Sequence, residues 1–247
     1  MWSNVESPIF VTGCKRSGTT MVARAIKLCG AFDLNFVDEE GNEILDPKYK
    51  IMFDNKVIYE ELVKPYFLEI GADPTGQYPL PDKVVIPTDW KEKVLDILFS
   101  YGYTEDKKWM LKDNTMGLIW RVWDYAFPNA KWVIVRRRTG DIADSCLKTG
   151  YMKAFSDFEI CKKVGAKNSR EGWVWWVNQY LARFREMIEA GLNCKIVWAE
   201  RMVIGNYQQM YETIEWLGLK WNSEVLNFVD PRLWRARERL ENGKNNS

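Results

Sequence analysis

The chain has 247 residues, 47% of them hydrophobic, which suits one α/β domain, or one domain with a large insertion, around a substantial core. Its 35 Lys and Arg residues almost equal its 34 Asp and Glu residues, so there is no net positive field to attract nucleic acid. Histidine is absent, which excludes serine–histidine and cysteine–histidine mechanisms and disfavours a zinc site. Any proton transfer would therefore fall to a carboxylate, a lysine, a tyrosine or water.

The cysteines and the apolar segments indicate the compartment. The five cysteines are scattered and show no paired metal-ligand spacing, which favours a reducing environment over a disulfide framework. The first predicted strand begins at Ile9, which leaves no room for a signal peptide. No apolar run approaches the roughly 18 residues that span a bilayer. We therefore expect a cytoplasmic protein without a membrane span.

The first predicted element is a strand that runs into a glycine-rich turn, in the segment PIFVTGCKRSGTT. Gly13 and Gly18 have the spacing of a nucleotide-binding loop, in which Lys and then Ser or Thr normally follow the second glycine. Here Thr19 occupies the lysine position, and the cations Lys15 and Arg16 lie inside the loop. A turn between a strand and a helix directs backbone N–H groups and the positive end of the helix dipole at one point. The loop is therefore predicted to bind a phosphate-like group.

A helix is predicted directly after this loop, because apolar residues recur with helical spacing up to Cys29 and Gly30 is a natural stop. The next region, residues 31–108, is harder to interpret. It is predicted to contain a helix near 54–70, a proline-rich loop at 74–87 and a helix near 88–101.

The second half of the chain alternates predicted strands and helices. The strands are expected at 109–111, 131–135 and 195–198. Helices are expected at 115–127, 171–190 and 207–217. Another helix is expected to begin at about Asp141, whose side chain can cap it. This alternation implies a parallel sheet covered on both faces. We predict a three-layer α/β sandwich with a central, mostly parallel sheet of the P-loop nucleotide-binding type. It would form a single domain over residues 1–247, with a frayed tail at 241–247.

A second anion site is predicted where the strand 131–135 ends. Arg136, Arg137 and Arg138 follow this strand, and Ser145 lies early in the next helix. An arginine at the carboxyl end of a strand and a hydroxyl on the following helix can converge on one phosphate, which arginine binds bidentately. Open α/β sheets hold their ligands at this edge. The alternative is a solvated run of arginines at the edge of the sheet.

Together the two motifs resemble those of the sulfotransferases that use 3′-phosphoadenosine 5′-phosphosulfate (PAPS). In that family an R/K-S-G-T-T loop binds the 5′-phosphosulfate, and a strand followed by R-x-x-x-D-x-x-x-S binds the 3′-phosphate. This sequence has RSGTT at 16–20, and Arg137, Asp141 and Ser145 at the family spacing. Further segments with family character are LKDNTM, FPNAKW, VWAERM and WLGLKWN, so the resemblance covers most of the chain outside 31–108.

The resemblance implies a donor site and part of the catalytic machinery. The residues that it assigns to donor binding are Lys15, Arg16, Ser17, Gly18, Thr19, Thr20, Arg137 and Ser145. Arg16 would also contact the leaving phosphate and the bridging oxygen, and Lys112 would stabilise the moving sulfuryl group. A sulfuryl group carries little charge and needs no metal bridge, so no metal is expected.

The catalytic base is where the sequence departs from the family. Many members have a histidine two residues after the lysine, where this chain has Asn114. Other branches use Glu or Asp from the segment after the first helix. The candidate bases here are Glu39, Glu40, Glu43, Asp54 and Asp113, of which we retain Glu40 and Glu43 as catalytic candidates. Each of them can instead be a solvated surface charge, and a dissociative transfer would depend less on a base.

Two further groups of residues have two interpretations. Trp173, Trp176 and Tyr180 share a helix face, which is more typical of a core than of a platform for adenine. The arginines within 232–239 could close over the 3′-phosphate, as a late basic loop does in part of the family, but the pattern favours a solvated helix.

The sequence thus predicts a sulfotransferase that moves a sulfuryl group from PAPS to a hydroxyl or amine of a small-molecule, sugar or lipid acceptor. Residues 31–108 are predicted to form the insertion that shapes the acceptor pocket. Two alternatives stay open. One is a magnesium-dependent P-loop kinase, in which Asp113 would be a metal ligand, and the other is a non-catalytic nucleotide-binding protein of the same fold.

Overall fold

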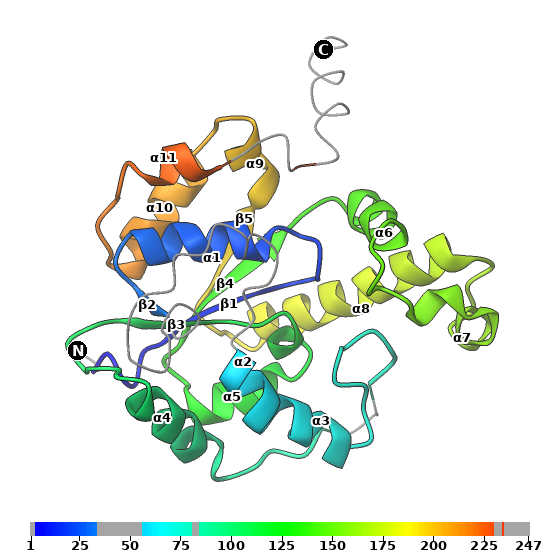
Figure 1. The fold of residues 1–247 in the computed structure, drawn as a ribbon, viewed down its shortest axis with the longest axis horizontal. Helices are drawn as coiled ribbons and strands as arrows, with labels where there is room; N and C mark the ends of the chain where they lie inside the picture. Colours follow the sequence, from blue (N-terminus) through cyan, green and yellow to red (C-terminus); the bar gives the residue numbers. More distant parts are fainter. Residues whose placement is uncertain (1–2, 34–55, 81–83, 230–233, 235–247) are drawn as a thin grey trace.

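The centre of the molecule is a sheet of five parallel strands in the order β2–β3–β1–β4–β5 (Figure 1). The computed structural model describes residues 3–33, 56–80, 84–229 and 234. The strands are β1 (Ile9–Gly13), β2 (Phe32–Asp33), β3 (Trp109–Lys112), β4 (Lys131–Arg136) and β5 (Cys194–Trp198). The predicted α/β class with a central parallel sheet is confirmed.

One face of the sheet is covered by helices that pack around the first helix (Figure 1). These helices are α1 (Thr19–Leu28), α9 (Ala199–Val203), α10 (Gln208–Leu217) and α11 (Val225–Phe228). Alternate strand residues point into this layer, so Ile9 and Val11 of β1 contact it, whereas Phe10 points to the opposite face.

The other face carries the larger core and most of the aromatic residues. Its helical segments are α2 (Lys56–Ile58), the π-helical η3 (Tyr59–Val63), α3 (Lys64–Glu69), α4 (Trp90–Ser100), η4 (Thr115–Gly117), α5 (Trp120–Ala126), α6 (Thr139–Leu147), η5 (Ala154–Ser156), α7 (Phe158–Lys163) and α8 (Ser169–Glu189). Phe10 lies edge-on to four surrounding rings with centroids 4.9 to 5.8 Å away. Trp173, Trp176 and Tyr180 are buried on α8, which confirms their predicted core role.

The structure corrects several predicted boundaries. The helix expected from Asp141 begins at Thr139, because Arg138 is extended and the chain turns helical directly after it. Asp141 is therefore not a cap. It lies in the first turn of α6, where its carboxylate accepts a hydrogen bond from Arg138 Nε at 2.8 Å and faces the positive end of the helix dipole. The helix expected at 115–127 is divided into η4 and α5.

No helix in the described ranges combines the length and the apolar character that are needed to cross a membrane.

Candidate functional site

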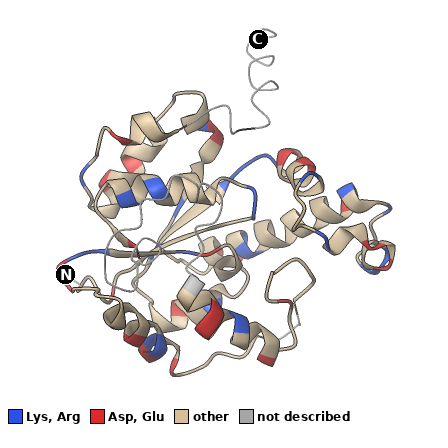
Figure 2. Cartoon of the chain, in the orientation of Figure 1, with Lys and Arg blue, Asp and Glu red and all other residues tan. Residues whose placement is uncertain are grey.

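The carboxyl ends of the parallel strands bring the two predicted motifs together. Gly13 at the end of β1 pairs in register with Val135 of β4, so the loop at 14–18 and the arginines at 136–138 leave the sheet side by side. In Figure 2 the ribbon of both connections carries the blue of Lys and Arg where it leaves β1 and β4, and Arg137 of one connection donates a hydrogen bond to the backbone of the other. The edge of the sheet where open α/β folds hold ligands is thus positively charged.

The loop between β1 and α1 has an unusual backbone. Arg16 has a φ of +73°, a left-handed conformation that is uncommon for a residue with a side chain. Gly18, at the N-cap of α1, has a φ of +97°, and a Cβ there would lie 2.8 Å from the Cβ of Ala199. This position therefore requires glycine both for conformation and for space. Ser17 lies fully buried between these two residues.

Arg16 links the loop to the second motif. Its Nε donates a hydrogen bond to Ser145 Oγ at 3.1 Å, and one terminal nitrogen approaches the hydroxyl of Tyr151 at 3.4 Å. Its carbonyl oxygen, turned by the left-handed backbone, accepts a hydrogen bond from Arg137 at 2.9 Å. Arg16 thus contacts both Arg137 and Ser145, the other two residues that the family resemblance assigned to the same donor.

The three consecutive arginines have three different environments. Arg136 lies over the ring of Trp198, and Arg138 is half-exposed and paired with Asp141. Arg137 is only 7% exposed and lies over the ring of Trp234, with 4.1 Å between its Cζ and the ring centroid. Burial lowers the pKa of Arg137, and the nearby carboxylates partly oppose this. The guanidinium nevertheless stays charged at neutral pH.

Several buried polar atoms around this edge have no hydrogen-bond partner among the described residues. They are Ser17 Oγ, Arg136 Nε, Arg137 Nε, Glu200 Oε2 and Trp234 Nε1. Buried polar groups in folded proteins almost always pair, so an unpaired cluster calls for a polar ligand or water. The cluster coincides with the cationic edge, and its donors, the Ser17 hydroxyl and the Nε groups of Arg136 and Arg137, fit a bound phosphate ester.

Lys112 lies at the end of β3, beside Val11 of β1. It is 3% exposed, so it is not a solvated lysine at the end of a strand. The next residue, Asp113, is also buried, and its carboxylate accepts hydrogen bonds from the backbone and hydroxyl of Thr115. A carboxylate held in this way is a poor candidate for a base that must accept a proton from an acceptor.

Asn114 has a role that sequence reasoning missed. Its amide nitrogen donates hydrogen bonds to the carbonyl of Gly13 at 2.6 Å and to Thr19 Oγ1 at 3.2 Å. The side chain at this position therefore holds both ends of the β1–α1 loop to the end of β3. Thr20 follows half-buried in the first turn of α1.

Lys15 reaches a turn in the region 31–108. Its ammonium donates a hydrogen bond to the carbonyl of Thr75 at 2.8 Å. The turn is built by the carboxylate of Asp73, which accepts hydrogen bonds from Thr75 and from the backbone of Gln77. Gln77 is buried and joined to the chain at 151–154. The structure thus connects the β1–α1 loop to a hydrogen-bonded turn of the predicted acceptor region.

A groove of about 500 Å³ begins at the residues that follow this turn. It is lined by Tyr78, Pro79, Ile160, Lys163, Val164 and Trp175. None of the residues that contact each other at the cationic edge belongs to its lining, so the groove is distinct from that edge.

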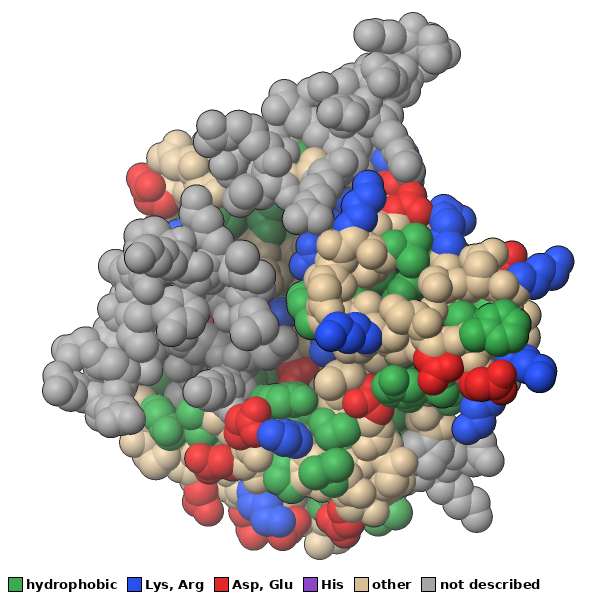
Figure 3. Space-filling view, turned by 45° about the vertical axis from the view of Figure 1, so that its right-hand side comes forward, with side chains coloured by type: hydrophobic (Ala, Val, Ile, Leu, Met, Phe, Trp, Pro, Cys, Tyr) green, Lys and Arg blue, Asp and Glu red, His purple; other side chains and the backbone are tan. Residues whose placement is uncertain are grey.

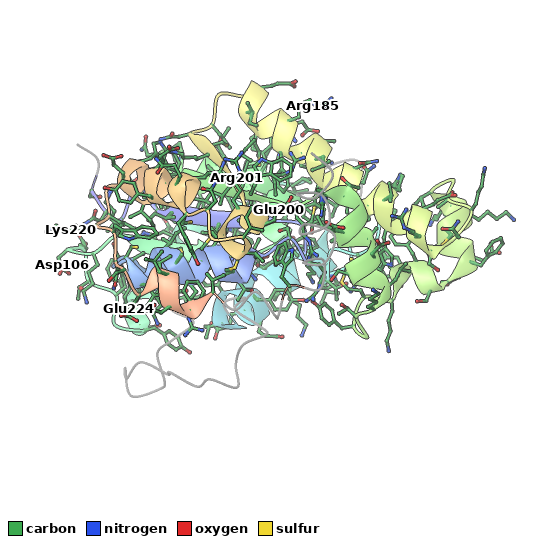
Figure 4. All side chains as sticks on the ribbon, turned by 90° about the horizontal axis from the view of Figure 1, so that it is seen from above. Asp106, Arg185, Glu200, Arg201, Lys220 and Glu224 are labelled. Carbon is green, nitrogen blue, oxygen red and sulfur yellow. The ribbon has the colours of Figure 1, made fainter. Side chains whose placement is uncertain are left out.

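Glu200 adds a carboxylate to the cationic edge. It lies in the first turn of α9, directly after β5 (Figure 4). Burial raises the pKa of its carboxyl, the charges of Arg138 and Arg137 lower it, and Asp141 raises it further. Nothing in the sequence pattern distinguished this residue from an ordinary surface glutamate.

The thiols beside the site are chemically inert. Cys14 lies in the loop, and Cys146 follows Ser145 on α6. Burial raises the pKa of Cys14 far above that of an ordinary thiol and raises the pKa of Cys146 to about 12. Both therefore stay protonated at neutral pH and cannot act as thiolate nucleophiles.

Some predicted residues lie outside the described part of the chain. These are the candidate bases Glu39, Glu40, Glu43 and Asp54, the arginines of the segment 232–239 and the tail at 241–247. Within the described ranges, no three histidine, cysteine or acidic side chains gather as a group that could hold a metal ion.

The protein is similar to known proteins in its three-dimensional structure and not in its sequence. No protein-family model matches the sequence, and no curated protein matches it. The crystal structure of sulfotransferase STF9 from Mycobacterium avium superposes with a TM-score of 0.57 at 14% identity, covering 94% of this chain and 68% of that one. The chain has the fold of the sulfotransferases.

Two further sulfotransferase structures share this fold. The sulfotransferase domain from the curacin biosynthetic pathway has a TM-score of 0.50 and 16% identity, covering 89% of this chain and 76% of that one. The sulfotransferase domain from the Synechococcus PCC 7002 olefin synthase has a TM-score of 0.50 and 13% identity, covering 92% and 80%. The likeness to the sulfotransferase fold thus covers about nine tenths of the chain or more in each of the three comparisons.

Proposed function

We propose that this protein is a PAPS-dependent sulfotransferase that transfers a sulfuryl group to a hydroxyl or amine acceptor. The observation that supports this best is the contact between the two motifs. Arg137 donates to the carbonyl of Arg16, and the side chain of Arg16 reaches Ser145. One cradle therefore offers cations and a hydroxyl to two anionic groups of a single ligand, as a doubly phosphorylated adenosine requires.

The residues of the chain have separate roles in this proposal. Arg137 and Ser145 bind the 3′-phosphate, while Ser17, Thr19, Thr20 and the first turn of α1 bind the 5′-phosphate. In the transfer, an acceptor oxygen or nitrogen forms a bond to sulfur as the bond from sulfur to the bridging oxygen breaks. Arg16 stabilises the negative charge that develops on the leaving phosphate, and Lys112 stabilises the moving sulfuryl oxygens.

The acceptor loses a proton in this reaction, and the proposal assigns its removal to Glu40 or Glu43 of the segment after α1 or to water. The acceptor is a small molecule, a sugar or a lipid, held by the region 31–108. The contact of Lys15 with Thr75 supports this division, because it ties the donor loop to that region.

A melting experiment without metal tests the donor. Adenosine 3′,5′-bisphosphate, at a hundredfold excess over its Kd, should stabilise the protein by about 2.7 kcal/mol, because it binds only the folded state. ADP, which lacks the 3′-phosphate, should stabilise the protein far less at the same concentration. Equal stabilisation by the two nucleotides would refute selection of the donor through its 3′-phosphate.

A further inference from the structure

Trp234 lies between the two phosphate motifs. Its ring is 4.1 Å from the guanidinium carbon of Arg137, measured to the ring centroid. A Cβ on Gly18 of the loop would come within 3.1 Å of the edge of the same indole. A single side chain from beyond α11 therefore contacts the turn that precedes α1 and the arginine that follows β4.

The contacts of the indole show what holds it there. Its Nε1 is buried and has no hydrogen-bond partner among the described residues, so a hydrogen bond to these residues does not hold the ring in place. The ring instead packs beside the apolar layer of α1 and α9 and presents one face to a cation. Attraction between a guanidinium and an indole face is strongest when both are shielded from water, as Arg137 is here at 7% exposure.

The guanidinium of Arg137 is consequently fixed on two sides. A terminal nitrogen is bonded to the Arg16 carbonyl, and one face lies over the ring of Trp234. Its Nε has no partner among the described residues. An arginine held in one plane keeps its remaining N–H groups aligned for bidentate binding of an oxyanion.

We propose that Trp234 is a positioning residue of the donor site, which acts through Arg137 and so controls affinity for the 3′-phosphate. This inference rests on the proposed function. Trp234 belongs to neither phosphate motif, and its loss should affect only one class of ligand. Loss of the indole lowers the affinity for ligands that carry a 3′-phosphate and leaves the affinity for ligands with only a 5′-group unchanged.

Titration calorimetry on the full chain tests this claim with two ligands, adenosine 3′,5′-bisphosphate and adenosine 5′-phosphosulfate. Trp234→Ala is expected to bind the bisphosphate about tenfold more weakly, with a change of less than about twofold for the phosphosulfate. Trp234→Phe retains an aromatic face and should stay close to wild type. The matched control is Trp216→Ala, because that indole also faces cations, Lys131 and Lys195, at the opposite end of β4.

A double variant separates positioning from a general loss of packing. If Trp234 acts through Arg137, the pair Arg137→Ala and Trp234→Ala binds the bisphosphate no more weakly than Arg137→Ala alone. Equal losses for both ligands, additive losses in the double variant, or a Trp234→Phe variant as weak as Trp234→Ala would overturn the inference. A wild-type protein that fails to bind the bisphosphate would overturn the proposed function as well, whereas unchanged binding by Trp234→Ala would overturn only the role of Trp234.

Discussion

Arg137 shows how one side chain can be distinguished within a run of like residues. Its neighbours Arg136 and Arg138 have the same charge, but one lies over Trp198 and the other pairs with Asp141 near solvent. Only Arg137 is buried, beside the loop carbonyl of Arg16. The sequence spacing selected the same arginine, because the family pattern counts four residues to Asp141 and eight to Ser145.

Replacement of Arg137 tests its assignment to the 3′-phosphate. Arg137→Ala should weaken adenosine 3′,5′-bisphosphate by about 2 kcal/mol or more, because it removes a buried charged donor, and should affect adenosine 5′-phosphosulfate far less. Calorimetric titration measures both. Arg201→Ala, which removes an exposed arginine on α9, is the control and should change neither affinity. Comparable losses for both ligands would mean that Arg137 is assigned to the wrong group.

Glu200 should make the stability of the protein depend on pH. Because burial raises the pKa of this carboxyl, the folded protein takes up its proton at a higher pH than the unfolded chain does. Wild-type stability should therefore gain from this group as pH falls from the raised pKa to the ordinary value, and Glu200→Gln should lack that gain. Melting temperatures of the variant and of Glu215→Gln, an exposed control on α10, measured between pH 7 and pH 4, would reveal it. Parallel curves for wild type and Glu200→Gln would contradict the prediction.

Other contacts at the residue scale could not be predicted. Asn114 binds Gly13 across neighbouring strands, and Trp234 reaches Arg137 from beyond α11. Both contacts depend on which segments become neighbours in the fold, and no local pattern of residues encodes that. The glycine-rich turn before α1 and the helix that carries Ser145 were predictable, because each follows from a continuous stretch of sequence.

The unit of β1, loop and α1 is the element on which the proposed donor site depends. Its strand is fully buried, its loop turns twice into the left-handed region, and its helix begins where the loop meets Ala199. Long elements such as α8 and α10 were predicted to within two residues, since their apolar spacing is extensive. The two-residue β2 and the short α7, α9 and α11 were not predicted. Segments of this length have too few residues to show a periodic pattern of apolar side chains.

Gly18 is the residue of this unit that tolerates change least. Gly18→Ala should lower the free energy of unfolding through its φ of +97° and through contact with Ala199, by about 2–4 kcal/mol in total. Gly191→Ala is the matched control, because Gly191 has a φ of +83° and open space around its Cβ position. That variant should lose only the conformational part, about 1–2 kcal/mol. Urea unfolding measures both, and equal losses would show that the loop adapts to a side chain.

At the scale of the molecule, charge is distributed without a dominant sign. On the face shown in Figure 3, basic and acidic side chains are interspersed with hydrophobic ones, in keeping with a net charge of +1. Attraction of an anionic ligand therefore depends on the local cationic edge and not on a field of the whole protein.

Metal dependence distinguishes the proposed reaction from that of a kinase. The loop has Thr19 where a magnesium-dependent nucleotide-binding loop has its lysine, and Asp113 is engaged with Thr115. The melting shift with adenosine 3′,5′-bisphosphate should therefore be the same in EDTA and in excess magnesium. A shift that appears only with magnesium, accompanied by hydrolysis of ATP, would favour the kinase.

The contact between Arg137 and Arg16 joins positions that are 121 residues apart in the chain. A ribosome delivers β1 and its loop long before it delivers β4, and β4 completes the cradle only after β1 has paired with it. Under the proposed function, a nascent polypeptide halted before Arg137 leaves the exit tunnel would have the β1–α1 loop but would lack the residue that selects the donor. Capture of the nucleotide by stalled chains of increasing length would thus report the moment at which the two strands meet.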